Sequence, residues 1–293
     1  MKLKYEIKEK DIDKSINNIL TNELNISTRL LTKLIKNEKI SIHNHKCDTR
    51  NIANLGDIIE INLDIPEDNS NIIATQMKLD IIYEDEWMIV VNKPARMPIH
   101  PSRLHYTDSL SNGIKFYFDS IGLAKKIRPV NRLDLGTSGL VIFAKCEYIQ
   151  EAFVQQMSDK TFQKEYLCFV DGILKQKIGS INLPIARKNG SIIERCIDKN
   201  NGHPSITHYE VIREFQNYSL VQCKLETGRT HQIRVHMQAI GHPIIGDTLY
   251  GNKAPFIDRQ ALHSYQIQCI HPVTKEKLNF IAELPKDMKV LSK

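Results

Sequence analysis

The sequence predicts an α+β protein with a mixed, mostly antiparallel sheet, preceded by a small α/β unit. After residue 78, strand-like apolar runs outnumber helical patterns and often follow one another directly, which disfavours a repeated strand–helix–strand topology. No glycine-rich nucleotide-binding loop and no internal repeat is present. The 293 residues are 41% hydrophobic and 25% charged, which suits a soluble chain with one large and one small domain.

Residues 12–65 are predicted to form the small unit. Apolar residues recur at helical spacing over 12–20 and again over 30–35, and Ser27 is a suitable N-cap for the second helix. A turn at Gly56-Asp57 precedes the last strand. Short strands with alternating apolar residues are expected at 40–42 and 59–63.

Positive charge is concentrated around the second of these helices. Residues 28–50 hold six basic and two acidic residues, and Lys33 and Lys36 share one helical face. Together with Arg29, these lysines are predicted to contact an RNA backbone. The alternative is an ordinary solvated helix face, and the local excess of positive charge favours RNA only modestly.

Residues 66–78 are polar and rich in turn formers, so they are predicted to be a linker, and 79–293 the main domain. Its strands are expected at 79–83, 87–92, 140–144, 166–170, 206–212, 220–225, 265–270 and 278–282. Its helices are expected near 109–121, 148–157 and 231–239.

The loop at 129–140 is the first segment with the residue types of a catalytic site. Arg132 and Asp134 are followed by small polar residues and two glycines, directly before a strand. We expect Arg132, with the hydroxyl groups of Thr137 and Ser138, to keep the Asp134 carboxylate charged and oriented. A purely structural pair of Arg132 and Asp134 is the alternative, and composition alone favours it.

The segment 226–237 gathers polar donors at the start of a helix, which Thr230 is expected to cap. Arginines beside a helix N-terminus are suited to binding anions. The two histidines of the segment, five residues apart, match no zinc motif, and the chain has no CxxC pair, so no metal site is expected. The donors are Arg229, His231, Gln232, Arg234 and His236.

These segments resemble the signature blocks of the RluA-type pseudouridine synthases, and the blocks occur in the family's order. The first is Asn131-Arg132-Leu133-Asp134 with Thr137–Leu140, where many members have His in place of Asn131. The other blocks are Asn92-Lys93-Pro94, Lys164-Glu165-Tyr166, Gly228–His236 with Gly241–Gly251, and Phe280–Pro285. The small unit resembles the S4 RNA-binding module through Ser27–Leu31, Ile40–His43 and Leu55–Ile61. Together the two resemblances cover nearly the whole chain.

The resemblance implies an isomerase that detaches uracil from its ribose in RNA and rejoins it through carbon 5, without a cofactor. The RNA would be ribosomal RNA or transfer RNA. Asp134 would be the single catalytic group and Arg234 its ion-pair partner. Tyr166 would stack on the base, and Arg132 would help to displace it. Arg229 would contact phosphate and Leu284 would form an apolar wall of the pocket, both by position only.

Two other functions remain open at this stage. A glycosidase or nucleosidase could use Asp134, although such enzymes usually need two carboxylates. A catalytically inactive RNA-binding protein would keep the same fold. The charged N-terminus, the unpaired cysteines and the lack of a long apolar run favour a cytoplasmic protein without a membrane partner. We also expect a monomer.

Overall fold

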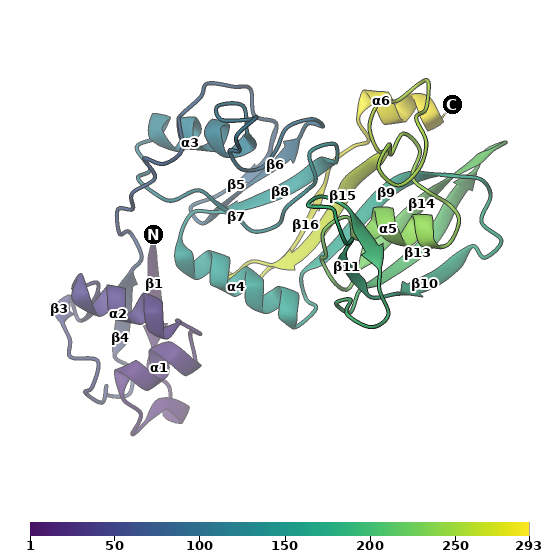
Figure 1. Ribbon diagram of the computed structural model, residues 1–293. Coiled ribbons are helices and arrows are strands. Elements are labelled where there is room, and N and C mark those ends of the chain that lie inside the picture. The colour runs from purple at the N-terminus through teal and green to yellow at the C-terminus, as the bar shows by residue number, and fades with distance from the viewer. Residues whose placement is uncertain (293) are drawn as a thin grey trace.

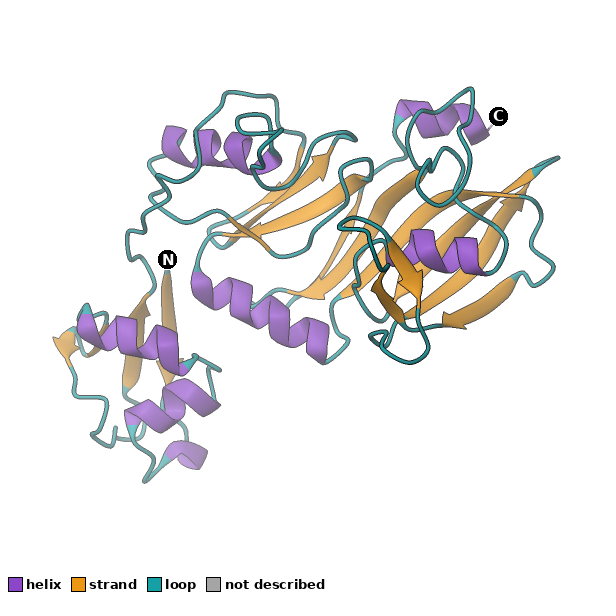
Figure 2. Ribbon diagram, in the orientation of Figure 1, coloured by secondary structure: helices purple, strands orange, loops and turns teal. Residues whose placement is uncertain are grey.

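The protein consists of a small N-terminal unit and a larger domain built around one long sheet (Figures 1 and 2). The structure, a computed structural model, describes residues 1–292. The small unit has a four-stranded antiparallel sheet in the order β1-β4-β2-β3. Its elements are β1 (Lys2–Glu6), a 3-10 turn (Glu9–Asp11), α1 (Ile16–Asn22), α2 (Thr28–Lys36), β2 (Ile40–Ile42), β3 (His45–Lys46) and β4 (Ile58–Asn62). The predicted start at residue 12 is too late, because Lys2–Glu6 pairs along the whole of β4.

Local sequence accounts for the two helices of the unit. Ser15 and Ser27 cap them, each accepting a hydrogen bond from the backbone N–H three residues later, at 3.3 and 3.2 Å. The first helix begins after Ile12, which is half exposed, because Asp13 has a positive φ of 66° that interrupts the helical pattern. Helix α2 buries its leucines, so its basic residues lie on the side away from the core of the small unit.

The larger domain contains a ten-stranded sheet in the order β10-β13-β14-β9-β15-β8-β6-β5, with β16 beside β15 and β7 beside β8, and a separate two-stranded sheet of β11 and β12. All pairs are antiparallel except β15 with β8, so the predicted mixed, mostly antiparallel sheet is confirmed. The N-terminal half contains β5 (Ile81–Glu84), β6 (Met88–Lys93), α3 (Leu110–Ser120), β7 (Arg128–Pro129), β8 (Ser138–Ala144), α4 (Glu147–Ser158) and β9 (Gln163–Asp171). The C-terminal half contains β10 (Ile178–Asn182), β11 (Ile185–Arg187), β12 (Arg195–Ile197), β13 (Ile206–Glu214), β14 (Tyr218–Leu225), α5 (Gln232–Ala239), β15 (Leu262–Ile270), β16 (Lys277–Ile281), α6 (Lys286–Lys289) and a 3-10 turn (Val290–Ser292).

The middle of the sheet is covered on both faces. Alternate residues of β8 point to two different apolar clusters: Leu140 and Ile142 pack with α4, whereas Val141 and Phe143 pack with α3. Figure 1 shows these two helices on opposite sides of the strands. All seven residues of β8 are therefore buried, which gives a rigid support for the loop that enters it.

The segment 66–78 has no helix or strand, as a linker should, yet it is fastened to the larger domain. Glu67 forms a bidentate ion pair with the buried Arg128, at 2.5 and 2.6 Å. Asn112 of α3 accepts from the N–H of Thr75 and donates to the carbonyl of Ile73. One apolar cluster also continues from the small unit to the α4 face of the sheet. The two units therefore do not have fully separate cores.

Candidate active site

Asp134 lies in the loop between β7 and β8, and two buried cations hold the backbone immediately after it. The Lys93 ammonium donates to the carbonyl of Leu135 at 3.4 Å, and the Arg259 guanidinium donates to that of Gly136 at 3.0 Å. Burial and the nearby Arg259 lower the pKa of Lys93 to about 7. The loop backbone is thus fixed from two sides, while the Asp134 side chain stays 26% exposed.

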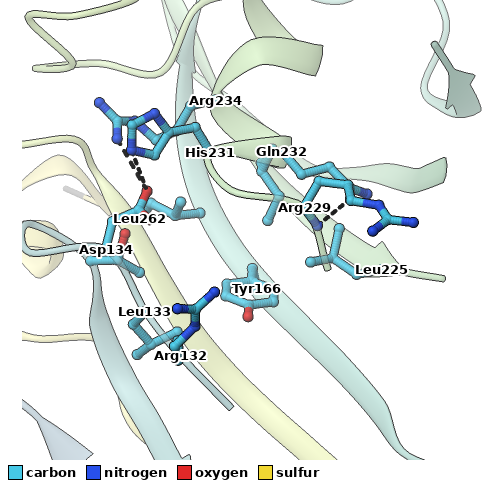
Figure 3. Close-up of a pocket in the computed structure, with 12 residues that line it drawn as sticks. Arg132, Leu133, Asp134, Tyr166, Leu225, Arg229, His231, Gln232, Arg234 and Leu262 are labelled. Carbon is cyan, nitrogen blue, oxygen red and sulfur yellow. Dashed lines mark hydrogen bonds and ion pairs between the residues drawn. The ribbon is translucent and has the colours of Figure 1, made fainter. Parts of the chain in front are cut away.

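Arg234, on α5, connects two carboxylates that are far apart in the sequence. Its Nε and Nη2 donate to Asp247 at 2.6 and 2.9 Å, and its Nη1 donates to Oδ2 of Asp134 at 3.1 Å (Figure 3). The ring of Tyr250 lies 5.0 Å from the guanidinium carbon. Because the fork to Asp247 fixes the plane of the guanidinium, its remaining N–H group is aimed at Asp134.

The surroundings of Arg234 favour its charged form, whereas those of the neighbouring His231 favour the neutral imidazole. Burial alone would lower the pKa of Arg234, but the carboxylates of Asp247 and Asp134 raise it. Burial lowers the pKa of His231, whose Nε2 lies 3.7 Å from Oδ2 of Asp134. His231 is in turn oriented by a 2.8 Å hydrogen bond between its Nδ1 and the Tyr250 hydroxyl.

A cavity opens beside the Asp134 carboxylate. Tyr166 of β9, which is 6% exposed, lies near Arg132 at its lower edge in Figure 3. A pocket of about 60 Å³ beside Asp134 adjoins a larger cleft of about 630 Å³, and the two share Asp134 and Tyr166 in their walls. The smaller pocket is lined mainly by Arg132, Leu133, Asp134, Thr137, Tyr166, Leu225, Arg229, His231, Arg234 and Leu262.

The structure brings together Asp134, Arg234, Tyr166, Arg132 and Arg229 around this cavity, as the sequence predicts. Leu284 is the exception: it is not among the residues that line the cavity. It packs, partly buried, against the apolar cluster that also contains Tyr166 and Leu262.

Of the predicted partners of the Asp134 carboxylate, Arg234 is confirmed, and Arg132, Thr137 and Ser138 are wrong. Arg132 is exposed and forms no ion pair with Asp134, and the Thr137 hydroxyl accepts from Gln260 at 3.2 Å instead. The Ser138 hydroxyl contacts Nδ1 of His263 at 2.9 Å. The ion pair comes from Arg234, one hundred residues later in the chain, as the family resemblance implies.

Two further corrections concern single residues. The helix α5 is not capped by the Thr230 side chain: His231 occupies the N-cap position with a φ of 59°, and no side chain caps it. Asn131 is buried. Many members of the family that the sequence resembles have His at this position. The amide of Asn131 donates to the carbonyl of Leu140 and accepts from the N–H of Ile142, each at 3.0 Å. Asn131 therefore fastens the loop to β8.

Sequence reasoning missed Asp247, Tyr250 and Arg259 as parts of the site. Asp247 and Tyr250 follow in a loop after α5, and only the order of the motifs could have linked them to Asp134. Arg259 carried no signal, because its partners are backbone carbonyls and Asp287 of the C-terminal helix, at 2.7 and 3.0 Å.

The basic residues of α2 face the larger domain more than expected. Lys33 pairs with Glu147 at the start of α4, and Arg29 lies 3.6 Å from the same carboxylate. The Ser27 hydroxyl donates to Glu151 at 2.7 Å. Lys36 is exposed and forms no ion pair within residues 1–292.

Within residues 1–292, no group of three or more His, Cys, Asp or Glu side chains is placed to hold a metal ion. No helix in this part of the chain is long and apolar enough to cross a membrane.

Comparison with known proteins agrees with this site. Residues 87–239 match the family model described as RNA pseudouridylate synthase. An uncharacterized RNA pseudouridine synthase of Bacillus subtilis (strain 168), YhcT, is 35% identical over 99% of this chain and 96% of its own length. Ribosomal large subunit pseudouridine synthase D of Neisseria meningitidis serogroup A is 34% identical over 88% of this chain and 72% of its own. Human RNA pseudouridylate synthase domain containing 1 shares the fold, with a TM-score of 0.58 and 26% identity over 70% of this chain and 83% of its own. The chain therefore belongs to the RluA-type family of RNA pseudouridine synthases, which isomerise uridine to pseudouridine in RNA.

Proposed function

We propose that this protein isomerises uridines of ribosomal RNA, with Asp134 as its single catalytic carboxylate. The observation that carries the proposal is the 3.1 Å pair between Asp134 and Arg234 at the wall of a cavity that also contains Tyr166. In the isomerisation, the bond between ribose C1′ and uracil N1 breaks, a bond between C1′ and C5 forms, and N1 replaces C5 as the site of a proton. Nothing is oxidised and nothing is added, so the reaction needs no cofactor.

The residues around the cavity have distinct proposed roles. The target base has to leave its stack, which costs a few kcal/mol. Tyr166 offers an aromatic surface for the displaced base, since stacking contributes roughly 1–3 kcal/mol. Arg132 is exposed at the rim and can fill the space the base vacates. Arg229 and the residues Arg29, Lys33 and Lys36 of α2 are proposed to contact RNA phosphates.

Two observations argue against a glycosidase or nucleosidase. Such enzymes usually flank the bond with two carboxylates. Asp247, the nearest other acid, is 1% exposed and fully engaged with Arg234. Glu226 lines the outer cleft, but it pairs with Lys160 and His208, each at 2.6 Å. Among the described residues, Asp134 is thus the one acid that lines the smaller pocket.

The ribosomal substrate is proposed because relatives such as the Neisseria enzyme are named ribosomal large subunit pseudouridine synthases, and mapping of pseudouridine tests it. Total RNA from a strain that lacks this gene should lose pseudouridine at one or a few positions of ribosomal RNA. A loss confined to transfer RNA would overturn that part of the proposal. We also propose a monomer that works in the cytoplasm, where ribosomal RNA is made in bacteria. Sedimentation of the purified protein and fractionation of cells test these two points.

The reaction itself is tested by tritium release. Purified protein should release tritium from unmodified ribosomal RNA transcribed with 5-tritiated uridine, and Asp134→Asn protein should not. Free uracil must not appear. Release of uracil in place of pseudouridine would support the nucleosidase, and no release from any cellular RNA would support an inactive RNA-binding protein.

A further inference from the structure

Lys164 shares a face of the sheet with the aromatic residue proposed to hold the base. Lys164 and Tyr166 are two residues apart on β9, and alternate side chains of a strand point the same way. Their Cα atoms are therefore about 7 Å apart along the strand. Both line the same open cleft. This distance is close to the spacing of neighbouring nucleotides along an RNA strand.

The ammonium of Lys164 has no partner in the structure. It is half-buried, and within residues 1–292 it donates no hydrogen bond and forms no ion pair. Burial lowers its pKa, and no carboxylate opposes that effect. Gly228 leaves the space in front of it open: a Cβ there would lie 3.2 Å from the ammonium nitrogen. A partly desolvated cation of this kind is stabilised by an anion that enters the cleft.

The charges around the cleft favour a polyanion. Three cations line it, namely Arg132, Lys164 and Arg229. The two acids that line it, Asp134 and Glu226, already pair with other cations, at 3.1 Å with Arg234 and 2.6 Å with Lys160. A cleft of about 630 Å³ with this excess of unpaired positive charge has room for a nucleotide with its flanking phosphate.

We propose that Lys164 binds the phosphodiester that adjoins the displaced uridine, and so holds the strand while the base lies against Tyr166. The proposal rests on the proposed function, since it needs an RNA substrate at Asp134. Lys164 is a binding and positioning residue and takes no part in bond breaking. It differs from the cations of α2, which belong to another part of the molecule.

Lys224 provides a matched control on the neighbouring strand. Lys224 pairs in register with Glu165, so it points to the opposite face of the sheet from Lys164, and it is exposed. We expect Lys164→Gln to raise KM for the RNA by about tenfold with a smaller change in kcat, as loss of a charged hydrogen bond should. The slope of log affinity against log salt concentration should become shallower by about 0.7, which is the change expected when one phosphate contact with a single strand is lost. Lys164→Arg should restore most of the affinity, and Lys224→Gln should change neither quantity.

A neutral linkage identifies the phosphate directly. An oligonucleotide around a uridine assigned by the mapping experiment is prepared with a methylphosphonate on its 5′ or its 3′ side. One of these two modified oligonucleotides should bind wild-type protein as weakly as the unmodified oligonucleotide binds Lys164→Gln protein. The same modification should cause no additional loss of affinity in Lys164→Gln protein. Additive losses at both linkages, or wild-type KM and salt slope in Lys164→Gln protein, would overturn the proposal. Neither result would affect the proposed function, which fails only if the wild-type protein makes no pseudouridine.

Discussion

Two regions of this protein carry positive charge that we propose to serve the RNA substrate, and they hold it in different ways. In the active site, Arg234 is 9% exposed and is locked by the fork to Asp247, which is itself 1% exposed. On α2, Arg29 is 78% exposed and Lys33 is 39% exposed, and both reach toward Glu147 of α4. Buried pairs fix one geometry, whereas exposed pairs are weak and exchange with solvent ions.

The contrast separates chemistry from docking. A buried guanidinium without its carboxylate costs several kcal/mol, so the Asp247–Arg234–Asp134 arrangement has one stable form. An exposed pair contributes 0–1 kcal/mol, so RNA phosphates can replace Glu147 as partners of α2. Changes in the first region should therefore alter turnover, and changes in the second should alter affinity and its dependence on salt.

The largest effect is expected at Asp134. Asp134→Asn removes the carboxylate but keeps the shape and a hydrogen-bond acceptor for Arg234, so the variant should fold and bind RNA. Turnover should fall by at least about a thousandfold, because no other group can replace the catalytic carboxylate. Tritium release, with circular dichroism and RNA binding as controls, measures this. Turnover within tenfold of wild type would move the catalytic group elsewhere.

Asp247 should have the next largest effect, although it touches no substrate. Asp247→Asn removes the charge that fixes Arg234, so the guanidinium loses its aim at Asp134. We expect kcat to fall about a hundredfold while KM changes little. Asp287→Asn serves as the comparison, because it removes the carboxylate charge paired with Arg259 and leaves the pair between Arg234 and Asp247 intact. If both variants lose only thermal stability and keep kcat, Asp247 has a structural role alone.

Tyr166 tests the base platform and should have a smaller effect. Tyr166→Ala removes a stacking surface worth roughly 1–3 kcal/mol, so kcat/KM should fall by about tenfold to a hundredfold. Tyr166→Phe keeps the ring and should keep the stacking part of that contribution. The comparison of the two variants separates the ring from the hydroxyl. Wild-type activity in Tyr166→Ala protein would show that the base stacks elsewhere.

Local patterns in the sequence predicted more of the fold than of the site's pairing. Eight strands of the larger domain follow from apolar runs, and Ser27 caps α2 as expected, because these features depend on near neighbours. The strands β1, β7, β10, β11 and β12 were not predicted, because only their pairing with other strands defines them. Likewise, Arg132 is two residues from Asp134 in sequence, but Arg234 is the partner of Asp134 in space.

Motif order explains why the site residues were still found. The family resemblance assigns Arg234 and Tyr166 to the same site as Asp134, although the sequence gives no distances between these residues. It has nothing to say about Arg259, whose partners are the carbonyl of Gly136 and a carboxylate of the last helix. Contacts of a side chain with distant backbone leave no pattern in one sequence.

The smallest effects, on α2, test whether Glu147 competes with RNA. Lys36 is exposed and unpaired within residues 1–292, whereas Lys33 pairs with Glu147. If an RNA phosphate must displace Glu147 to reach Lys33, the binding free energy gained from the new contact is partly offset by the loss of the ion pair between Lys33 and Glu147. Lys36→Gln should then weaken RNA binding by about threefold, and Lys33→Gln by less. Both differences should shrink as salt rises from about 0.05 to 0.5 M, because exposed charges are screened.

The decisive variant is Glu147→Gln, which frees Arg29 and Lys33 without changing the size of the side chain. RNA affinity at low salt should rise by up to about fivefold, and kcat on saturating RNA should not change. In the Glu147→Gln background, Lys33→Gln should weaken binding as much as Lys36→Gln does. If Glu147→Gln leaves affinity unchanged and Lys33→Gln has the same small effect in both backgrounds, the contact between α2 and α4 merely joins the two units. The RNA-docking surface would then have to lie on another face of the small unit.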